Sequence, residues 1–128
     1  MFHRATTEDY KELVEWWKAH GWDAPPIEIL PFGVVYSEDG VNKAAGFLYT
    51  ASNAPVGYLE YIVANPENSG RESYKAVDAV IAELLQQARY SLIKCCFSRI
   101  QQDGLEKLYK KNGFHSGDKV KDMIWGEF

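Results

Sequence analysis

The side chains that most often bind metals or exchange electrons, cysteine and histidine, are few in this 128-residue chain and are not arranged for either task. Cys95 and Cys96 are adjacent, so they lack the two-residue spacing of zinc and redox motifs. Strand alternation would send their side chains to opposite faces of a sheet. His3, His20 and His115 form no cluster in the sequence. We therefore expect neither a disulfide framework nor a metal site.

The overall composition predicts a folded protein that binds neither nucleic acid nor membrane. Apolar residues make up 46% of the chain and charged residues 25%, as in ordinary globular domains, and the length fits one domain spanning residues 1–128. The net charge of -4, with scattered Lys and Arg, gives no attraction for a phosphate backbone. No apolar run matches a membrane span, and the first residues lack the layout of a secretory signal. The expected location is the cytosol.

Hydrophobic periodicity and turn signals predict the positions of the elements. Thr6 or Thr7 can cap a first helix, which is expected to end near His20 and Gly21. The connection from Ala24 to Gly33 is expected to be a loop or a short helix. The expected strands, in chain order, are Phe2 to Arg4, Gly33 to Ser37, Ala44 to Ala51, Val56 to Ala64, Leu92 to Phe97 and Val120 to Trp125.

The longest predicted helix follows a polar loop from Pro66 to Ser73 and carries a broad apolar stripe. It connects two predicted strands, and such a crossover implies parallel pairing between them. The dipeptide at Asp39 and Gly40 instead predicts a tight antiparallel hairpin. A shorter helix is expected from Gln102 to Lys111, with Gly113 ending it in the left-handed conformation. These elements predict an α/β (α+β) fold around a mixed, mostly antiparallel sheet.

Two local patterns are more informative together than separately, because they occur in a specific order along the chain. The loop before the long helix contains Arg71 to Ala76, which begins with a basic residue and ends with a small one, and the last helix ends in LYKKNGF, Leu108 to Phe114. Each pattern alone is common, as a polar loop or as a glycine-terminated helix. Together, over essentially the whole chain, they resemble the GNAT family of N-acetyltransferases. The resemblance implies a GNAT-like central sheet with helices on both faces.

The resemblance also implies transfer of an acetyl group from acetyl-CoA to a primary amine in a ternary complex, without a metal. In the family, the backbone amides of an R/Q-x-x-G-x-G/A loop cradle the CoA pyrophosphate at a helix N-terminus. Tyr74 stands here in place of the middle glycine. A register that starts at Ser69 keeps Gly70 but loses both later glycines, so we prefer the Arg71 register, which implies a slightly longer loop. The matching residues are Arg71, Glu72, Ser73, Tyr74, Lys75 and Ala76.

Tyr109 and Glu60 are the catalytic candidates that the resemblance implies. Tyr109 would lie near the CoA sulfur and act as a general acid when the thiolate leaves, although helical spacing alone favours a packed aromatic beside Leu105. Glu60 lies in a strand that is otherwise poor in charge, and it would remove a proton from the acceptor ammonium. Alternation predicts that it shares a face with Tyr58, Ile62 and Ala64. The alternative for Glu60 is an ordinary solvated strand residue.

Further residues are assigned to acetyl-CoA and to the acceptor. The resemblance implies that backbone groups of Ile62, Val63 and Ala64 bind the pantetheine arm of CoA. In the family, this strand diverges from its neighbour and leaves these groups free. An amide of this stretch can also stabilise the negative charge on the thioester oxygen. Gln102 stands where the family often has an asparagine that supports CoA. Trp16, Trp17 and Trp22 could line the acceptor pocket, but core packing is the better explanation of these residues.

Two other functions remain open. Tyr74 and Gln102 depart from the family pattern, which is compatible with a catalytically inactive GNAT-fold binding or regulatory module, with or without affinity for CoA. An interaction protein that does not touch CoA is the third possibility. The acceptor is a small amine, a peptide N-terminus or a protein lysine, and the protein is expected to be a monomer or a homodimer. The compact layout with WWKAHGW near its start is also similar to small acetyltransferases carried by bacterial viruses.

Overall fold

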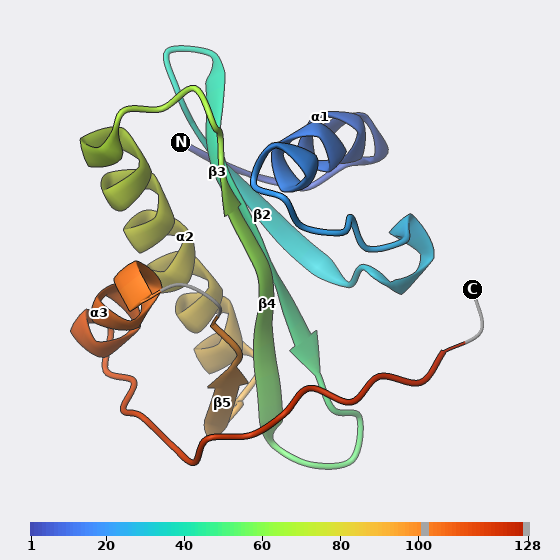
Figure 1. Cartoon of the computed structure of the whole chain (residues 1–128). Helices are drawn as coiled ribbons and strands as arrows, with labels where there is room; N and C mark the ends of the chain where they lie inside the picture. Colours follow the sequence, from blue (N-terminus) through green and yellow to red (C-terminus); the bar gives the residue numbers. More distant parts are fainter. Residues whose placement is uncertain (101–102, 127–128) are drawn as a thin grey trace.

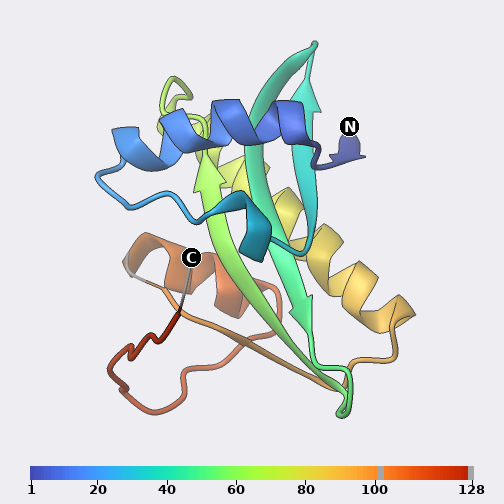
Figure 2. The ribbon, with the colours of Figure 1, turned by 90° about the vertical axis from the view of Figure 1, so that its right-hand side faces the viewer.

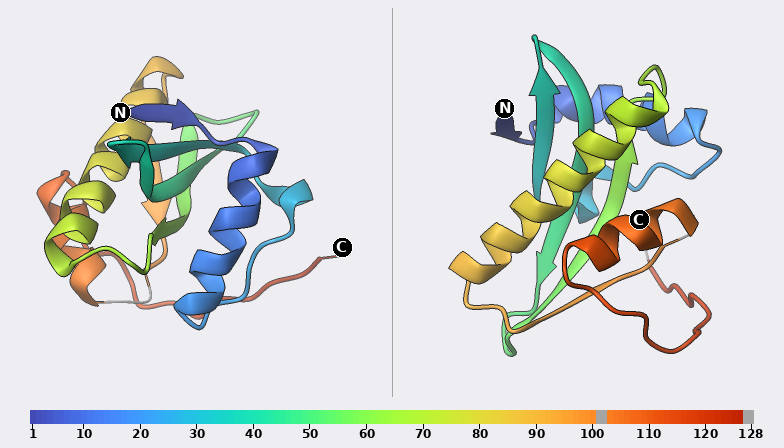
Figure 3. Two further views of the ribbon diagram at one scale, coloured as in Figure 1. Left: turned by 90° about the horizontal axis from the view of Figure 1, so that it is seen from above. Right: turned by 90° about the vertical axis from the view of Figure 1, so that its left-hand side faces the viewer.

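The computed structural model describes residues 1–100 and 103–126, and in this range the chain forms one five-stranded sheet with helices on both faces (Figure 1). The strands lie side by side in chain order, β1-β2-β3-β4-β5. Helix α1 covers one face, and helices α2 and α3 cover the other (Figure 3). The elements are β1 (Phe2–Arg4), α1 (Thr7–Ala19), the short 3-10 helix η1 (Ile27–Ile29), β2 (Phe32–Glu38), β3 (Val41–Thr50), β4 (Val56–Ala64), α2 (Gly70–Tyr90), β5 (Cys95–Ser98) and α3 (Asp103–Lys111).

Strand pairing follows the prediction through β5. The first four strands pair in antiparallel order, and the turn at Asp39 and Gly40 has positive φ values of 52° and 76°, as the tight hairpin requires. Strand β5 pairs with β4 in parallel order, because α2 carries the chain back across the sheet between them. The mixed, mostly antiparallel sheet is therefore confirmed.

The predicted strand from Val120 to Trp125 is wrong. Within the described residues, this segment has no regular secondary structure and no neighbouring strand. Its four large apolar side chains are 76 to 88% exposed. A β-strand depends on hydrogen bonds from a neighbour, so a β-prone composition alone does not make one.

Helix α1 begins at a Thr6 cap, one of the two positions that the sequence allows. The Thr6 hydroxyl accepts from the Asp9 amide, and the Asp9 carboxylate accepts from the Thr6 amide, which satisfies two otherwise unpaired donors. The helix then buries Leu13 and Trp17 against the sheet. This cluster forms the smaller of two apolar cores.

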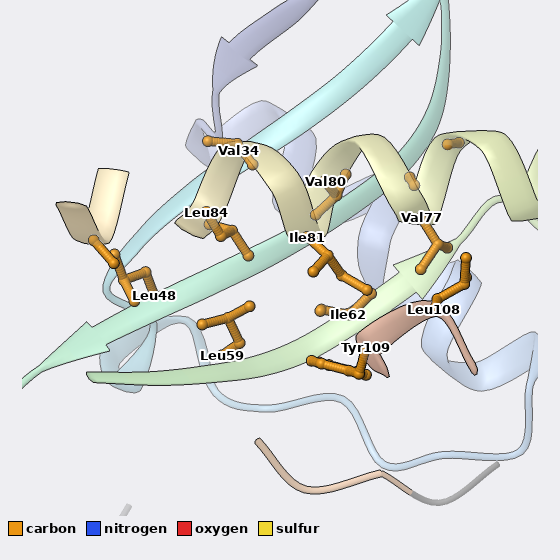
Figure 4. Close-up of a cluster of buried hydrophobic side chains, with 13 residues drawn as sticks. Val34, Leu48, Leu59, Ile62, Val77, Val80, Ile81, Leu84, Leu108 and Tyr109 are labelled. Carbon is orange, nitrogen blue, oxygen red and sulfur yellow. The ribbon is translucent and has the colours of Figure 1, made fainter. Parts of the chain in front are cut away.

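The larger core lies between the sheet and α2 and α3 (Figure 4). The α2 stripe of Val77, Val80, Ile81 and Leu84 is at most 6% exposed, as its helical spacing predicts. Helix α3 adds Leu108 and Tyr109 beside Leu59 and Ile62 of β4. This core positions α2 and α3 relative to the end of β5.

A β-bulge in β4 changes which side chains share a face. Phe47 pairs with Glu60 and Ala45 with Val63, so β4 carries one extra residue in this stretch. Tyr61 has a φ of 57° there, which is uncommon for a residue other than glycine. The bulge leaves Glu60 on the α1 face and Ile62 in the core beneath α2. The prediction that these two residues share a face is therefore wrong, since simple alternation holds only in a regular strand.

Candidate active site at the fork of strands β4 and β5

Strands β4 and β5 separate halfway along β4 (Figure 2). Their parallel pairing runs from Val56 beside Cys95 to Leu59 beside Ser98, and β5 ends there. Strand β4 continues to Ala64, so among the described residues its last five positions have no neighbouring strand on this side. We call this opening the fork. The predicted pantetheine residues Ile62 and Val63 lie along its open edge.

Part of this edge is already used by the chain itself. The carbonyl oxygen of Ala64 lies 3.0 Å from His20 Nε2, so it accepts a hydrogen bond when that nitrogen carries the proton. Trp22 stacks on the His20 ring, with the ring centroids 4.9 Å apart. The backbone groups of Ile62 and Val63 are therefore better candidates for hydrogen bonds to a ligand than the Ala64 carbonyl, which already has a partner.

Tyr109 reaches the fork from α3. Its hydroxyl lies 2.6 Å from Ser98 Oγ, and Ser98 Oγ in turn lies 2.8 Å from the carbonyl oxygen of Leu59. These contacts place the phenol at the point where the two strands part. Phe114 packs edge-on against the Tyr109 ring, and Gly113, with a φ of 96°, ends α3 and allows the chain to turn back for this contact.

The single hydroxyl proton of Ser98 gives this cluster two arrangements. If Ser98 donates to the Leu59 carbonyl, which can only accept, the Tyr109 hydroxyl donates to Ser98. If Ser98 donates to Tyr109, the phenol proton is released for another acceptor in the fork. Burial of Tyr109 is the main cause that raises its pKa to about 12, so the hydroxyl is protonated at neutral pH. Tyr109 is thus arranged to donate a hydrogen bond or a proton.

Glu60 forms an ion pair that the sequence did not reveal. Arg99 Nε donates to one carboxylate oxygen at 3.0 Å and Arg99 Nη2 to the other at 2.9 Å. The guanidinium also contacts Asp122, and these two carboxylates raise the pKa of Arg99, with the hydrogen bond to Glu60 as the largest cause. Both Glu60 oxygens are therefore occupied. The alternative of a solvated Glu60 does not fit, because its side chain is only 12% exposed.

The N-terminus of α2 differs from the predicted loop. The helix begins at Gly70, so the prediction that residues up to Ser73 form a loop is wrong. The Ser69 hydroxyl accepts from the Glu72 amide at 3.1 Å, and the Glu72 carboxylate accepts from the Ser69 amide at 2.8 Å. The spacing of Ser69 and Glu72 is the S-x-x-E capping box, a signal present in the sequence that we did not use.

This start of α2 moves the candidate phosphate-binding amides upstream. The Ser73 amide donates to the Ser69 carbonyl, and in a helix the amides of Tyr74, Lys75 and Ala76 donate to carbonyls four residues earlier. Among the described residues, the amides of Gly70 and Arg71 are the ones at this terminus without a partner. The register that starts at Ser69 therefore fits the helix better than the one we preferred.

The charged groups at this helix terminus are also paired. Lys43 Nζ donates to Glu72 at 2.9 Å, and this bond is the first cause that lowers the pKa of Glu72 to about 2. Lys75 pairs with Glu38 at 2.6 Å. Arg71 is exposed. The positive side chains near Gly70 are therefore two paired lysines and one exposed arginine.

The remaining predicted residues fall into three groups. Tyr74 is half exposed, with Lys111 Nζ 5.4 Å from its ring centroid, so it packs at the surface and not in a phosphate loop. Trp16 and Trp17 are buried in the core under α1, which favours packing over an acceptor pocket. Gln102 lies outside the described residues.

Two cavities lie away from the fork. The larger, of about 330 Å³, opens beside the last turn of α2 and is lined by Pro31, Phe32, Leu48, Tyr49, Thr50, Gln87 and Ser91. The smaller, of about 150 Å³, lies between the start of α1 and the 3-10 helix. Neither contains Tyr109 or Glu60. We give more weight to the fork, because an extended ligand that adds to a strand edge needs no enclosed cavity.

Residues 1–100 and 103–126 contain neither a metal-binding cluster nor a membrane-spanning helix. No group of three or more Cys, His, Asp or Glu side chains is placed to hold a metal ion. In the same residues, every helix is too short or too polar to cross a membrane.

Comparisons with known proteins address the fold. No known family profile matches the chain, and a search of curated proteins also finds no match. Among solved structures, an acetyltransferase from Trypanosoma brucei aligns with 98% of this chain and 99% of its own, at 15% identity and a TM-score of 0.73. A Mycobacterium tuberculosis protein solved in complex with CoA aligns with 96% of this chain and 76% of its own, at 16% identity and a TM-score of 0.71. A GNAT-family structure from Novosphingobium aromaticivorans aligns with 91% of this chain and 52% of its own, at 14% identity and the same TM-score. The chain therefore has the GNAT fold.

Proposed function

We propose that this protein transfers an acetyl group from acetyl-CoA to a primary amine. The observation that carries the proposal is the fork, where an edge of β4 that has no neighbour among residues 1–100 and 103–126 lies beside a buried, protonated tyrosine hydroxyl. The edge can bind an extended amide-containing arm, and the hydroxyl can donate to a leaving group at the end of that arm. The match to acetyltransferase folds, one of them solved with CoA, supports the same function.

The binding of acetyl-CoA would use two parts of the chain. Ile62 and Val63 would bond the pantetheine arm through their backbone, as an added strand does. The amides of Gly70 and Arg71 would receive the pyrophosphate at the positive end of α2. Arg71 and a released Lys43 would supply positive charge beside them. This assignment replaces the backbone of Tyr74 to Ala76, whose amides are used inside the helix.

Acetyl transfer requires two groups from this chain: a proton donor for the leaving sulfur and a hydrogen-bond donor for the acetyl oxygen. Acetyl-CoA supplies an acetyl group already activated as a thioester, and the amine nitrogen forms the new bond to the acetyl carbon while the carbon–sulfur bond breaks. Tyr109 would donate its proton toward the departing sulfur, with Ser98 orienting the hydroxyl. A backbone amide at the fork would stabilise the negative charge on the acetyl oxygen. No covalent bond to the protein is required.

Removal of the amine proton involves Glu60 and Arg99. Both Glu60 oxygens accept from Arg99, so an acceptor amine contacts the carboxylate most directly when Arg99 leaves at least one of them. Asp122 also contacts the guanidinium, so Arg99 stays paired when it shifts. We propose that an acceptor ammonium takes the place of Arg99 at Glu60, which makes Glu60 the base and Arg99 its resting partner.

The finer features of this function rest on the sequence. The acceptor is a small amine, a peptide N-terminus or a protein lysine, and we propose that the reaction takes place in the cytosol. Similarity of WWKAHGW to small viral acetyltransferases remains a prediction about the source of the chain.

A second function, a binding module without turnover, is favoured by the paired charges of the site. The Glu72 carboxylate already occupies the N-terminus of α2, and both oxygens of Glu60 are held by Arg99. A chain in which these pairs never open could bind part of CoA and transfer nothing.

Thermal unfolding with acetyl-CoA, CoA or ATP, followed by a thiol-release assay with a panel of amines, separates these functions. A ligand that binds only the folded state raises the melting temperature by mass action. An enzyme shows a shift with acetyl-CoA together with thiol release that depends on an amine. A binding module shows the shift alone. The absence of any shift at millimolar acetyl-CoA would refute both.

A further inference from the structure

Four aromatic side chains lie near Glu60 on the face of the sheet that carries α1. Phe97 of β5 stacks on Tyr58 of β4, with ring centroids 5.6 Å apart, and both rings are about half exposed. Tyr61 follows Glu60 directly at the bulge, and its ring centroid lies 6.4 Å from that of Tyr49 on β3. The two pairs of rings thus flank Glu60 along β4.

The part of this face that carries the rings is open. In Figure 2, α1 crosses the upper half of the sheet, and the described residues place no α-helix over the lower half of β4 on this side. The 3-10 helix reaches the border of this area, where the Tyr49 hydroxyl donates to the Ile29 carbonyl at 2.7 Å. Because this bond uses the phenol proton, Tyr49 presents its ring and not a free donor. Exposed rings gathered beside a charged group indicate an interaction site.

A cation of the chain itself occupies this site. Arg99 donates to both Glu60 oxygens, at 3.0 and 2.9 Å, and it is about half exposed, whereas Glu60 is only 12% exposed. A largely buried carboxylate is costly to leave without a partner, so a ligand that displaces Arg99 must bring a positive charge of its own. Burial is the main cause that raises the pKa of Tyr49 to about 12, and the charge of Glu60 contributes to it. The neutral ring of Tyr49 would therefore lie close to the bound cation, which aromatic faces attract.

The spacing of the rings and the carboxylate limits what can bind to both. Tyr58 and Glu60 are two residues apart on one face, so their backbone positions are about 6.6 Å apart. A ring placed on Tyr58 and Phe97 and an ammonium held by Glu60 are then joined by a linker of about two to four carbon atoms. An aromatic ring covers such a pair more fully than an alkyl chain does, with a stacking contribution beyond the buried area. A polyamine would need further carboxylates, and Asp122 beside this site is already paired with Arg99.

We propose that Tyr58 and Phe97 determine acceptor specificity by selecting a small primary amine with an aromatic ring on a short alkyl chain. The ring lies on these two side chains, and the ammonium replaces Arg99 at Glu60. The acceptor class rests on the proposed acetyl transfer. The amine nitrogen forms the bond to the acetyl carbon as the carbon–sulfur bond breaks. It loses two protons: one passes through Glu60 to solvent, and the other replaces the proton that Tyr109 gives to the sulfur.

Thiol release from acetyl-CoA with 3-phenylpropylamine, propylamine, spermidine and a lysine-containing peptide tests the acceptor class. The kcat/KM for 3-phenylpropylamine is expected to exceed that for propylamine, which has the same linker without the ring, by about ten-fold or more. Equal values for these two amines, or a higher value for spermidine or the peptide, overturn the acceptor class and leave the proposed acetyl transfer standing. The absence of thiol release with every amine refutes the acetyl transfer and the acceptor class with it.

Substitution of the two rings tests where the acceptor lies. Tyr58→Ala and Phe97→Ala are each expected to lower the ratio of kcat/KM for 3-phenylpropylamine to that for propylamine about three- to ten-fold. The matched control is Tyr90→Ala, which removes an exposed ring at the end of α2 and should leave the ratio unchanged. Melting curves check that the variants fold, and Phe97→Leu provides a version that keeps apolar bulk without the ring. A ratio that stays constant in the Tyr58 and Phe97 variants, or that falls equally in Tyr90→Ala, overturns the proposal.

Discussion

The two regions expected to hold acetyl-CoA differ in how far the chain already satisfies its own hydrogen bonds. At the fork, the β5 side of β4 beyond Leu59 has no neighbouring strand among the described residues, and the Tyr109 hydroxyl changes partner when one serine proton turns. At the N-terminus of α2, the Glu72 carboxylate holds the Ser69 amide and Lys43. The end proposed to hold the acetyl group is thus formed in advance, and the end proposed to hold the phosphates is closed by an internal anion.

This difference indicates where a bound ligand would have to displace part of the protein. A pyrophosphate at Gly70 and Arg71 would stand beside Glu72, and like charges at one helix terminus repel. Binding there would be favoured if Glu72 moved and left Lys43 to the phosphate. At the fork, the β4 edge and Tyr109 require no such exchange to bind acetyl-CoA, and only the acceptor amine displaces Arg99, so substitutions in the two regions are expected to change different kinetic constants.

The largest effect is expected at the fork. Tyr109→Phe removes the proton donor but keeps the packed ring, so kcat should fall about a hundred-fold or more, with little change in the KM for acetyl-CoA. The exposed Tyr90 gives a matched control, since Tyr90→Phe should leave kcat unchanged. Steady-state kinetics with a good amine acceptor measure both. A Tyr109→Phe enzyme with an unchanged kcat would remove Tyr109 from the mechanism.

A smaller effect is expected from the partner of that hydroxyl. Ser98→Ala removes the bond that orients Tyr109 and leaves the proton in place, so kcat should fall about three- to ten-fold, the value of one neutral hydrogen bond. Ser98→Thr keeps an oxygen and should recover part of the loss. If Ser98→Ala lowers activity as much as Tyr109→Phe, Ser98 does more than orient the phenol.

Local patterns in the sequence predicted much of the fold and less of the site. The LYKKNGF ending placed Tyr109 on α3, and Gly113 has the left-handed conformation expected of a helix stop. The capping box at Ser69 and Glu72 was also readable, and using it would have placed the start of α2 correctly. These features depend on residues three to seven positions apart.

The missed features depend on contacts between distant parts of the chain. Arg99 meets Glu60 across 39 positions, and no local pattern relates them. The bulge at Tyr61 reverses the alternation of β4. Gly46 opposite allows the close packing there, because a Cβ at Gly46 would lie 2.8 Å from Val80 Cγ1. The final predicted strand failed for the same reason, since its pairing partner is not a sequence neighbour.

The closed helix terminus is tested by Glu72→Gln. Removing this charge frees Lys43, while the glutamine oxygen can still accept from the Ser69 amide, so CoA should bind about two- to five-fold more tightly, the effect of one charge at a helix end. Glu67→Gln makes the same change in net charge on an exposed residue outside α2. Isothermal titration with CoA compares the two variants with the unchanged chain. Equal affinities in all three would show that Glu72 does not compete with the ligand.

The smallest effect concerns stability in acid. Lys43 and the Ser69 amide lower the pKa of Glu72 from 4.5 to about 2, so the folded state binds this proton less readily than the unfolded state does. The stabilisation is therefore fully present above pH 4.5 and is lost as the pH falls toward 2. Because Glu72 is about half exposed, solvent screening keeps the loss small. Urea unfolding at several pH values should show a shallower decline for Glu72→Gln than for the unchanged chain. Parallel declines would mean that the capping box and the Lys43 pair do not form in solution, and the contrast between a closed helix terminus and an open fork would no longer hold.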